Sequence, residues 1–242
     1  MRTTKINDNL ILHEYNDGLL FGTDALLLSK FVVGGIRKKV VDLGSGSGVI
    51  GFLLLNEKKA GHVFGVEIQE KYAKLSEYNA ELNNLNKQYT SINCDLKEIR
   101  NYFKSGYADI VVSNPPYMKI TYGKKNISEE KSIARHEVCC NIDDVCKAAS
   151  WCLKSGGDFY LVHRPERISA IFNSMKRYNI EPKKLIPISS SIKSAPSLIL
   201  VSGKKDASEG LIFYPMLFLF SDNDKRIPIS DEELNNSFKF VK

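Results

Sequence analysis

The sequence predicts an α/β fold: a doubly wound, mostly parallel sheet of seven strands, preceded by a short hairpin and helix extension. From about residue 38, short apolar runs alternate with segments of helical periodicity, which is the pattern of βαβ units. A glycine-rich turn joins the first of these runs to the first helix, as in sheets that bind a ligand at their carboxyl edge. Hydrophobic residues make up 43% of the 242 residues, which is enough for one full core.

The individual elements follow from this alternation. Strands are expected at residues 39–43, 62–67, 89–94, 108–113, 157–163, 184–189 and 197–202. Helices are expected at residues 48–56, 70–83, 96–103, 143–153 and 165–177. Pro165 lies in the first turn of the last helix, where its missing N–H costs nothing. We therefore treat residues 38–242 as one structural unit.

The first 37 residues stand outside this alternation and form the extension. Apolar runs at 10–15 and 19–21 flank Asn16-Asp17-Gly18, a turn sequence typical of β-hairpins. Thr23 is placed to cap a helix over 24–31, and Asp24 then lies in the first helical turn.

Charge and hydropathy limit the classes of partner. The net charge is +6, from 34 Lys and Arg against 28 Asp and Glu, which weakly favours a polyanion such as RNA or DNA. The longest apolar stretch, 211–220, contains Pro215 and is too short to span a bilayer. The N-terminus lacks the apolar core of a signal peptide. We therefore expect a cytoplasmic protein with no membrane partner.

The cysteines and histidines predict neither a disulfide framework nor a metal site. The five cysteines, at positions 94, 139, 140, 146 and 152, are odd in number and lack the CxxC spacing. The four histidines are scattered along the chain. Reduced thiols and no bound metal are expected.

The glycine-rich turn has the features of a site for an adenosine-containing cofactor. Gly46, Gly48 and Gly51 match G-x-G-x-x-G, in which glycine lets a ligand approach the backbone and the helix start offers free N–H groups. Glu67 ends the second strand, where a carboxylate can accept both hydroxyls of a ribose. S-adenosylmethionine and NAD both fit this pattern. Glu67 could also be an ordinary surface acid at a strand end.

The Asn114-Pro115-Pro116-Tyr117 motif follows the fourth strand and is the most informative feature of the chain. Two prolines cannot continue a strand, so the chain turns out of the sheet at the edge where such sheets bind ligands. The Asn114 side-chain oxygen and the Pro115 carbonyl can each accept one N–H of a planar amine, and Tyr117 can stack on its plane. The alternative is a proline-rich turn that merely ends a core strand.

These motifs resemble those of amino-methyltransferases that use S-adenosylmethionine, and the whole chain resembles the bacterial tRNA-Val (adenine-37-N6)-methyltransferases. Three segments carry the narrower resemblance: Gly22-Thr23-Asp24, Ala134-Arg135-His136-Glu137 and Arg164-Pro165-Glu166-Arg167. The resemblance implies a Rossmann-like methyltransferase sheet and the product S-adenosylhomocysteine. It also implies methyl transfer to the exocyclic N6 of adenine 37 in the anticodon stem-loop, after that base has left its stack.

The resemblance also implies roles for particular residues. Catalysis is expected from Asn114, Pro115, Pro116 and Tyr117. Cofactor binding is expected from Thr23, Asp24, Asp42, Gly44, Ser45, Gly46, Gly48, Glu67, Ile68, Asp95 and Leu96, with residues 1–37 packed on that site. Asp95 fits equally well as the N-cap of the helix at 96–103, and Thr23 and Asp24 as capping residues. RNA phosphate contacts are expected from Lys119, Lys124, Lys125, Lys131, Arg135, Arg164 and Arg167.

Other functions remain open. Protein-glutamine N5-methyltransferases that modify release factors share the Asn-Pro-Pro-Tyr motif, although 37 residues leave little room for the helical N-terminal domain they usually carry. An N6-adenine or N2-guanine methyltransferase for another RNA or for DNA is a second alternative. An NAD-dependent dehydrogenase would depend on the glycines and Glu67 alone, and a non-catalytic RNA-binding module would leave the motifs unexplained. The sequence does not determine the oligomeric state; we expect a monomer.

Overall fold

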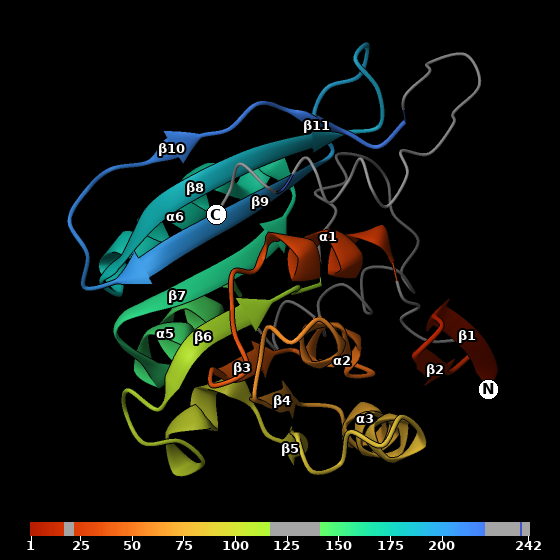
Figure 1. Ribbon diagram of the computed structural model, residues 1–242. Coiled ribbons are helices and arrows are strands. Elements are labelled where there is room, and N and C mark those ends of the chain that lie inside the picture. The colour runs from red at the N-terminus through yellow and green to blue at the C-terminus, as the bar shows by residue number, and fades with distance from the viewer. Residues whose placement is uncertain (17–21, 117–140, 221–237, 239–242) are drawn as a thin grey trace, which may run out of the picture.

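The computed structural model describes residues 1–16, 22–116, 141–220 and 238, and it confirms the expected α/β class (Figure 1). The strands are β1 Arg2–Asn7, β2 Leu10–Glu14, β3 Lys39–Leu43, β4 His62–Glu67, β5 Tyr89–Asn93, β6 Ala108–Ser113, β7 Leu153–His163, β8 Ile180–Ser189, β9 Leu198–Lys205, β10 Ile212–Phe213 and β11 Leu217–Phe218. The helices are α1 Thr23–Phe31, α2 Val49–Asn56, α3 Glu70–Leu82, η1 Leu96–Asn101, α5 Ile142–Cys152, η2 Pro165–Arg167 and α6 Ile168–Arg177.

The main sheet contains the seven expected strands in the order β8-β9-β7-β6-β3-β4-β5. Neighbouring strands from β7 to β5 are parallel, whereas β9 runs antiparallel to both β7 and β8. The two-residue strands β10 and β11 each add to β8, beyond the seven. The chain order reverses between β3 and β6, and ligands of open α/β sheets bind at such a point.

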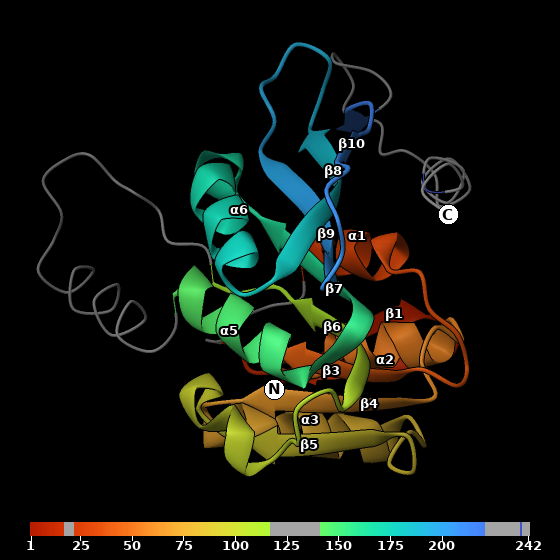
Figure 2. The same cartoon turned by 90° about the vertical axis from the view of Figure 1, so that its left-hand side faces the viewer.

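Helices cover both faces of the sheet (Figure 2). Helices α1, α2 and α3 pack on one face, and η1, α5 and α6 lie on the other. Successive residues of a strand point to opposite faces, and each face has its own hydrophobic core. Val40 and Ile110 belong to the core under α1 and α2, and Val41 and Val111 belong to the core under α5 and α6. Because both faces are covered, the central strands are mostly apolar on both faces rather than alternating between apolar and polar residues.

The N-terminal hairpin forms at a different turn from the expected one. Strand β2 pairs with β1, with Arg2 opposite Glu14 and Thr4 opposite Leu12, so the turn lies at Asp8-Asn9 and not at Asn16-Asp17-Gly18. The expected second arm, 19–21, lies outside the described residues. Strand β1 is polar and half-exposed, so apolar periodicity did not reveal it as a partner.

Other boundaries also differ from expectation; β8 and β9, for example, are each longer than expected. Helix α1 is capped by Gly22 without a side-chain bond, so Thr23 is the first helical residue and not the cap. The helix expected at 96–103 is a shorter 3₁₀ helix, η1. Strand β7 begins directly after α5 because Gly156, at φ 75°, lets the chain bulge and continue pairing with β6. No helix in the described ranges is long and apolar enough to cross a bilayer.

Candidate active site

The turn between β3 and α2 bends at three glycines with positive φ: Gly44 at 77°, Gly46 at 55° and Gly48 at 89°. Residues with a Cβ are strained in this region of φ. A Cβ at Gly44 or Gly46 would meet no atom within 4 Å, whereas one at Gly48 would lie 2.6 Å from the ring of Phe52. Gly44 and Gly46 therefore face open space that a ligand can enter, and Gly48 allows the turn to pack against α2.

A fully buried carboxylate lies beneath this turn. Asp42 is 0% exposed, and neither of its oxygens has a well-formed hydrogen bond within the described chain. The pKa of Asp42 is raised to about 7, mainly by burial and also by the nearby Glu67 carboxylate, while the backbone N–H of Gly51 partly opposes the rise. Such a carboxylate favours the approach of a cationic or hydrogen-bond-donating group.

Glu67 joins the end of β4 to the glycine turn. One carboxylate oxygen accepts from the Gly46 N–H at 3.0 Å, and the other accepts from the Gln69 N–H at 2.8 Å. Burial raises the pKa of Glu67, while the N–H groups of Gln69, Gly46 and Ile68 act against that rise. The Gly44 and Ser45 N–H groups both donate to the carbonyl of Val66, so the turn and the end of β4 form one bonded unit.

The end of β5 completes the same edge. Asp95 caps η1 by accepting from the Lys97 N–H at 2.9 Å, so the capping interpretation of this residue is confirmed. The Asn93 side chain donates to the carbonyls of Glu67 and Ile68, at 2.9 and 3.0 Å, and ties β5 to β4. Ile68 is 43% exposed beside them, which leaves an apolar surface available to a ligand.

The Asn-Pro-Pro-Tyr motif begins directly beside the glycine turn. Ser113 pairs with Leu43 in the parallel sheet, and its buried hydroxyl donates to the Leu43 carbonyl at 2.8 Å. Asn114 and Gly44 therefore leave the sheet side by side. Asn114 is half-buried, Pro115 is buried and Pro116 is exposed, while Tyr117 lies outside the described residues.

These features coincide with a known family. Residues 16–177 match the family described as the methyltransferase small domain. The chain belongs to this family. The match spans the glycine turn, Glu67, Asp95 and the Asn-Pro-Pro-Tyr motif.

Curated relatives of this methyltransferase chain carry the name expected from the resemblance. A tRNA1(Val) (adenine(37)-N6)-methyltransferase of Shewanella sp. (strain MR-4) is 26% identical over 147 residues, covering 60% of this chain and 61% of the relative. The protein of that name from Shewanella baltica (strain OS185) is 26% identical over 199 residues, covering 80% and 81%. The Aeromonas hydrophila protein of that name is 30% identical over 142 residues, covering 58% of each.

Solved structures confirm the methyltransferase fold. A predicted O-methyltransferase, protein Atu636 from Agrobacterium tumefaciens, superposes with a TM-score of 0.70 at 20% identity, over 89% of this chain and 96% of that one. A geranyl diphosphate methyltransferase in complex with SAM superposes with a TM-score of 0.54 at 14% identity, over 76% and 84%.

The remaining residues expected in the methyltransferase site lie at the start of α1, at the end of β7 or outside the described residues. Thr23 and Asp24 begin α1, which packs on α2, and within the described residues they make no hydrogen bond or ion pair with the glycine turn. Arg164 and Arg167 lie at the end of β7, where the Arg164 guanidinium donates to the Ser197 carbonyl at 3.0 Å. The other expected RNA contacts, Lys119, Lys124, Lys125, Lys131 and Arg135, lie outside the described residues.

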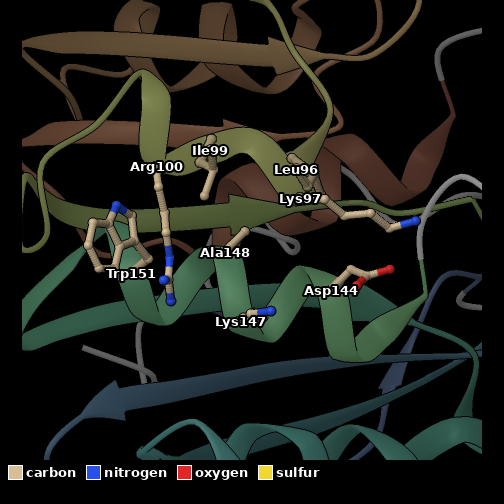
Figure 3. Close-up of a pocket in the computed structure, with 8 residues that line it drawn as sticks. All are labelled: Leu96, Lys97, Ile99, Arg100, Asp144, Lys147, Ala148 and Trp151. Carbon is tan, nitrogen blue, oxygen red and sulfur yellow. The ribbon is translucent and has the colours of Figure 1, made fainter.

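A small pocket between η1 and α5 shares Leu96 with the expected cofactor residues. Figure 3 shows Leu96 and Arg100 of η1 facing Ala148 and Trp151 of α5. The Arg100 guanidinium stacks 4.5 Å from the centre of the Trp151 ring. The pocket has a volume of about 20 Å³, which is room for roughly one water molecule, so it cannot hold a cofactor.

Cysteines and metal ligands add no further chemistry among the described residues. Cys94, Cys146 and Cys152 are free and buried, and burial raises the pKa of each thiol, which keeps it protonated and unreactive. No group of three or more His, Cys, Asp or Glu side chains in this part of the chain is arranged to hold a metal ion.

Sequence reasoning missed two asparagines that support the site. Asn79 and Asn83 of α3 bind the main chain of β2, and Asn79 also binds the glycine turn. The available signal was the position of Asn79 on the buried face of α3, with Tyr72, Leu75 and Ser76. A polar side chain on such a face needs a partner.

Proposed function

We propose that the chain is a methyltransferase that transfers a methyl group from S-adenosylmethionine to the exocyclic N6 of adenine 37 in tRNA-Val. The observation that carries this proposal is the pairing of Ser113 with Leu43, which puts the Asn-Pro-Pro-Tyr motif beside the glycine turn. The substrate is supported by the relatives named tRNA1(Val) (adenine(37)-N6)-methyltransferase, which share 26% to 30% identity with the chain.

The residues at the edge of β3, β4 and β5 fit S-adenosylmethionine. The open space before Gly44 and Gly46 accommodates its methionine end, close to the buried Asp42 carboxylate. Glu67 is placed to accept ribose hydroxyls, and Ile68 offers apolar surface to the adenine. Asp95 and Leu96, just past β5, complete the adenine side. Thr23 and Asp24 are proposed to close the methionine end. A solved structure with SAM bound shares this fold.

The catalytic residues act by holding the target amine. When bound, S-adenosylmethionine supplies an already activated methyl group, so the protein needs to position the acceptor more than to activate it. In this proposal the Asn114 side-chain oxygen accepts one N–H of the adenine amine and the Pro115 carbonyl accepts the other. Two acceptors in that arrangement direct the nitrogen lone pair toward the methyl donor. Pro116 shapes the turn, and Tyr117 stacks on the flipped base.

RNA affinity is assigned to the basic residues around the motif. Arg164 and Arg167 follow β7, two strands from the cofactor turn, and the lysines of 118–141 continue from the motif itself. Contacts with phosphates release counterions, so binding of tRNA should weaken steeply as salt rises. A filter-binding series from low to physiological salt measures this slope. A flat response would assign the affinity to base contacts and not to these residues.

The function is tested by a methyl-transfer assay with labelled S-adenosylmethionine. The substrates are unmodified tRNA, release factor and duplex DNA, followed by nucleoside analysis of labelled RNA. We expect label in tRNA as N6-methyladenosine. Asn114→Ala should remove transfer while leaving cofactor affinity nearly unchanged, and Asn86→Ala, an exposed asparagine in the turn before β5, should leave both intact.

Each other outcome of that assay overturns a defined part of the proposal. Label in release factor alone would identify a glutamine methyltransferase that uses the same motif. Label in DNA, in another RNA or in a guanine product would retain the chemistry and reject the substrate. Equal loss of transfer and cofactor binding in Asn114→Ala would show that Asn114 supports the fold and does not hold the amine.

A further inference from the structure

Three distant segments meet at the side chain of Asn79, which is completely buried. Its Oδ1 accepts from the His13 N–H at 2.9 Å, and its Nδ2 donates to the His13 carbonyl at 3.0 Å. The same Nδ2 donates to the Ser47 carbonyl at 3.2 Å. His13 belongs to the N-terminal hairpin. Ser47 lies between Gly46 and Gly48 in the glycine turn that joins β3 to α2, which we call the cofactor turn.

Asn83, one turn later on α3, makes the matching pair of bonds without touching the cofactor turn. It accepts from the Ile11 N–H at 2.9 Å and donates to the Ile11 carbonyl at 2.7 Å. One helical turn rises about 5.4 Å, close to the roughly 6.8 Å between residues two apart on a strand. The two asparagines therefore satisfy alternate residues of the β2 edge much as a neighbouring strand would.

The bond to Ser47 acts on the part of the turn that a ligand meets. Fixing the Ser47 carbonyl orients the peptide that carries the Gly48 N–H, which donates to the Ser45 carbonyl at 2.9 Å. Gly46, on the other side of Ser47, donates to Glu67 at 3.0 Å. A shift at Ser47 would therefore disturb both the hydrogen bond from Gly48 to Ser45 that closes the turn and the hydrogen bond from Gly46 to the Glu67 carboxylate.

We propose that Asn79 is a positioning residue through which the N-terminal hairpin holds the cofactor turn in its binding form. The proposal rests on the proposed function only in taking this turn as the site of S-adenosylmethionine. Because coupling between two sites is reciprocal, a docked hairpin strengthens cofactor binding, and bound cofactor strengthens docking of the hairpin. The hairpin is then part of the cofactor site without touching the cofactor.

The first test compares Asn79→Ala with Asn83→Ala. Each variant loses a two-bond contact with β2, but only Asn79→Ala loses the bond to Ser47. Calorimetry with S-adenosylhomocysteine should show a Kd about 5-fold weaker in Asn79→Ala than in Asn83→Ala, as expected for one hydrogen bond. Urea unfolding should show similar losses of stability in both variants. In steady state, Asn79→Ala should raise the KM for S-adenosylmethionine and change kcat little.

The second test uses the wild-type chain, so it does not depend on either variant folding. Hydrogen exchange is followed at the amides of Ile11 and His13, with Val201 in β9 as the reference for global opening. Adding S-adenosylhomocysteine should slow exchange at both hairpin amides by about 5-fold relative to Val201.

Contrary results separate this proposal from the proposed function. Equal cofactor affinity in the two alanine variants would overturn the coupling and leave the cofactor assignment intact. The same conclusion would follow if S-adenosylhomocysteine slowed hydrogen exchange at the Gly46 and Gly48 amides but not at the hairpin amides. Failure of the wild-type chain to bind S-adenosylhomocysteine would overturn the proposed function and this inference together.

Discussion

The hydroxyl of Ser113 donates to the carbonyl oxygen of Leu43 at 2.8 Å, in the buried region where β6 and β3 end. The next residues along the two strands are Asn114 and Gly44. One side-chain bond thus joins the start of the Asn-Pro-Pro-Tyr motif to the start of the glycine turn. In the proposed reaction these two segments hold the methyl acceptor and the methyl donor.

Removal of this bond should affect the reaction more than cofactor binding. In Ser113→Ala the Leu43 carbonyl loses its donor and the two strand ends are free to separate slightly. Because misplacement of reacting groups is costly, we expect kcat to fall about 10-fold and the Kd of S-adenosylhomocysteine to change less than about 2-fold. The matched control is Ser202→Ala, which removes the hydroxyl of a different buried serine, in β9. Equal losses of kcat in the two variants would contradict the account.

Glu67 should be essential for cofactor affinity. In Glu67→Gln one carboxylate oxygen becomes an NH₂ group, which cannot accept from either Gly46 or Gln69. An unpaired buried N–H and the loss of a charged acceptor cost about 1.5–3 kcal/mol, so the Kd should rise about 10- to 100-fold. Calorimetry measures this change. Glu70→Gln, which alters an exposed carboxylate paired with Lys74, should leave the Kd unchanged.

Asp42 should make the ligand-free protein less stable as pH rises. The folded state raises the pKa of Asp42 from 3.8 to about 7, mainly through burial, so the folded chain binds this proton more tightly than the unfolded chain. The contribution of the protonated group is complete below about pH 4 and is lost as pH rises through 7. The unfolding free energy of Asp42→Asn should therefore gain on that of the wild type by ~3 kcal/mol between pH 5 and 8.

Asp109→Asn is the control for this pH effect. Burial alone would raise the pKa of Asp109, but the Lys39 N–H and the Lys154 ammonium hold it below its ordinary value. Its stabilisation is therefore complete above about pH 4, and its difference from the wild type should stay constant between pH 5 and 8. Urea unfolding at both pH values checks the two variants. A constant difference for Asp42→Asn would show that Asp42 is ionised in the folded chain across this range.

Gly65 should be required for stability, because any side chain at this position would collide with the hydroxyl of Tyr89. A Cβ at Gly65 would collide with the Tyr89 hydroxyl and lie 2.9 Å from Ser45 Oγ. Gly65→Ala should therefore lower the unfolding free energy by about 1–3 kcal/mol. Tyr89→Phe should restore part of this loss, because it removes the colliding atom and that hydroxyl makes no well-formed hydrogen bond among the described residues. Gly35→Ala, where a Cβ meets no atom within 4 Å, should have little effect. Absence of rescue in the double variant would reject the collision as the cause.

Much of the fold follows from the sequence because its strongest local signals agree with the tertiary arrangement. The apolar runs that became the central strands β3 and β6 are buried on both faces, so their apolar character persists along most of each strand. Gly44, Gly46 and the prolines at 115 and 116 restrict the backbone in known ways, and the structure has the chain leave the sheet at these residues, as expected from the sequence.

The missed features depend on partners that are distant in sequence. Asn79 binds His13 and Ser47, which lie 66 and 32 residues away, and no local pattern specifies such contacts. Strand β1 is polar and pairs with β2, so no apolar alternation in the sequence marks this pairing. The expected contacts of Tyr117 and the lysines of 118–141 lie outside the described residues and stay predictions.

The most direct test of the central claim is a crystal structure of the chain with S-adenosylmethionine bound. We expect the ribose hydroxyls on Glu67, the methionine end over Gly44 and Gly46, and the methyl-bearing sulfur facing the side-chain oxygen of Asn114. A cofactor bound in another cleft, or an Asn114 amide directed away from the sulfur, would contradict the account.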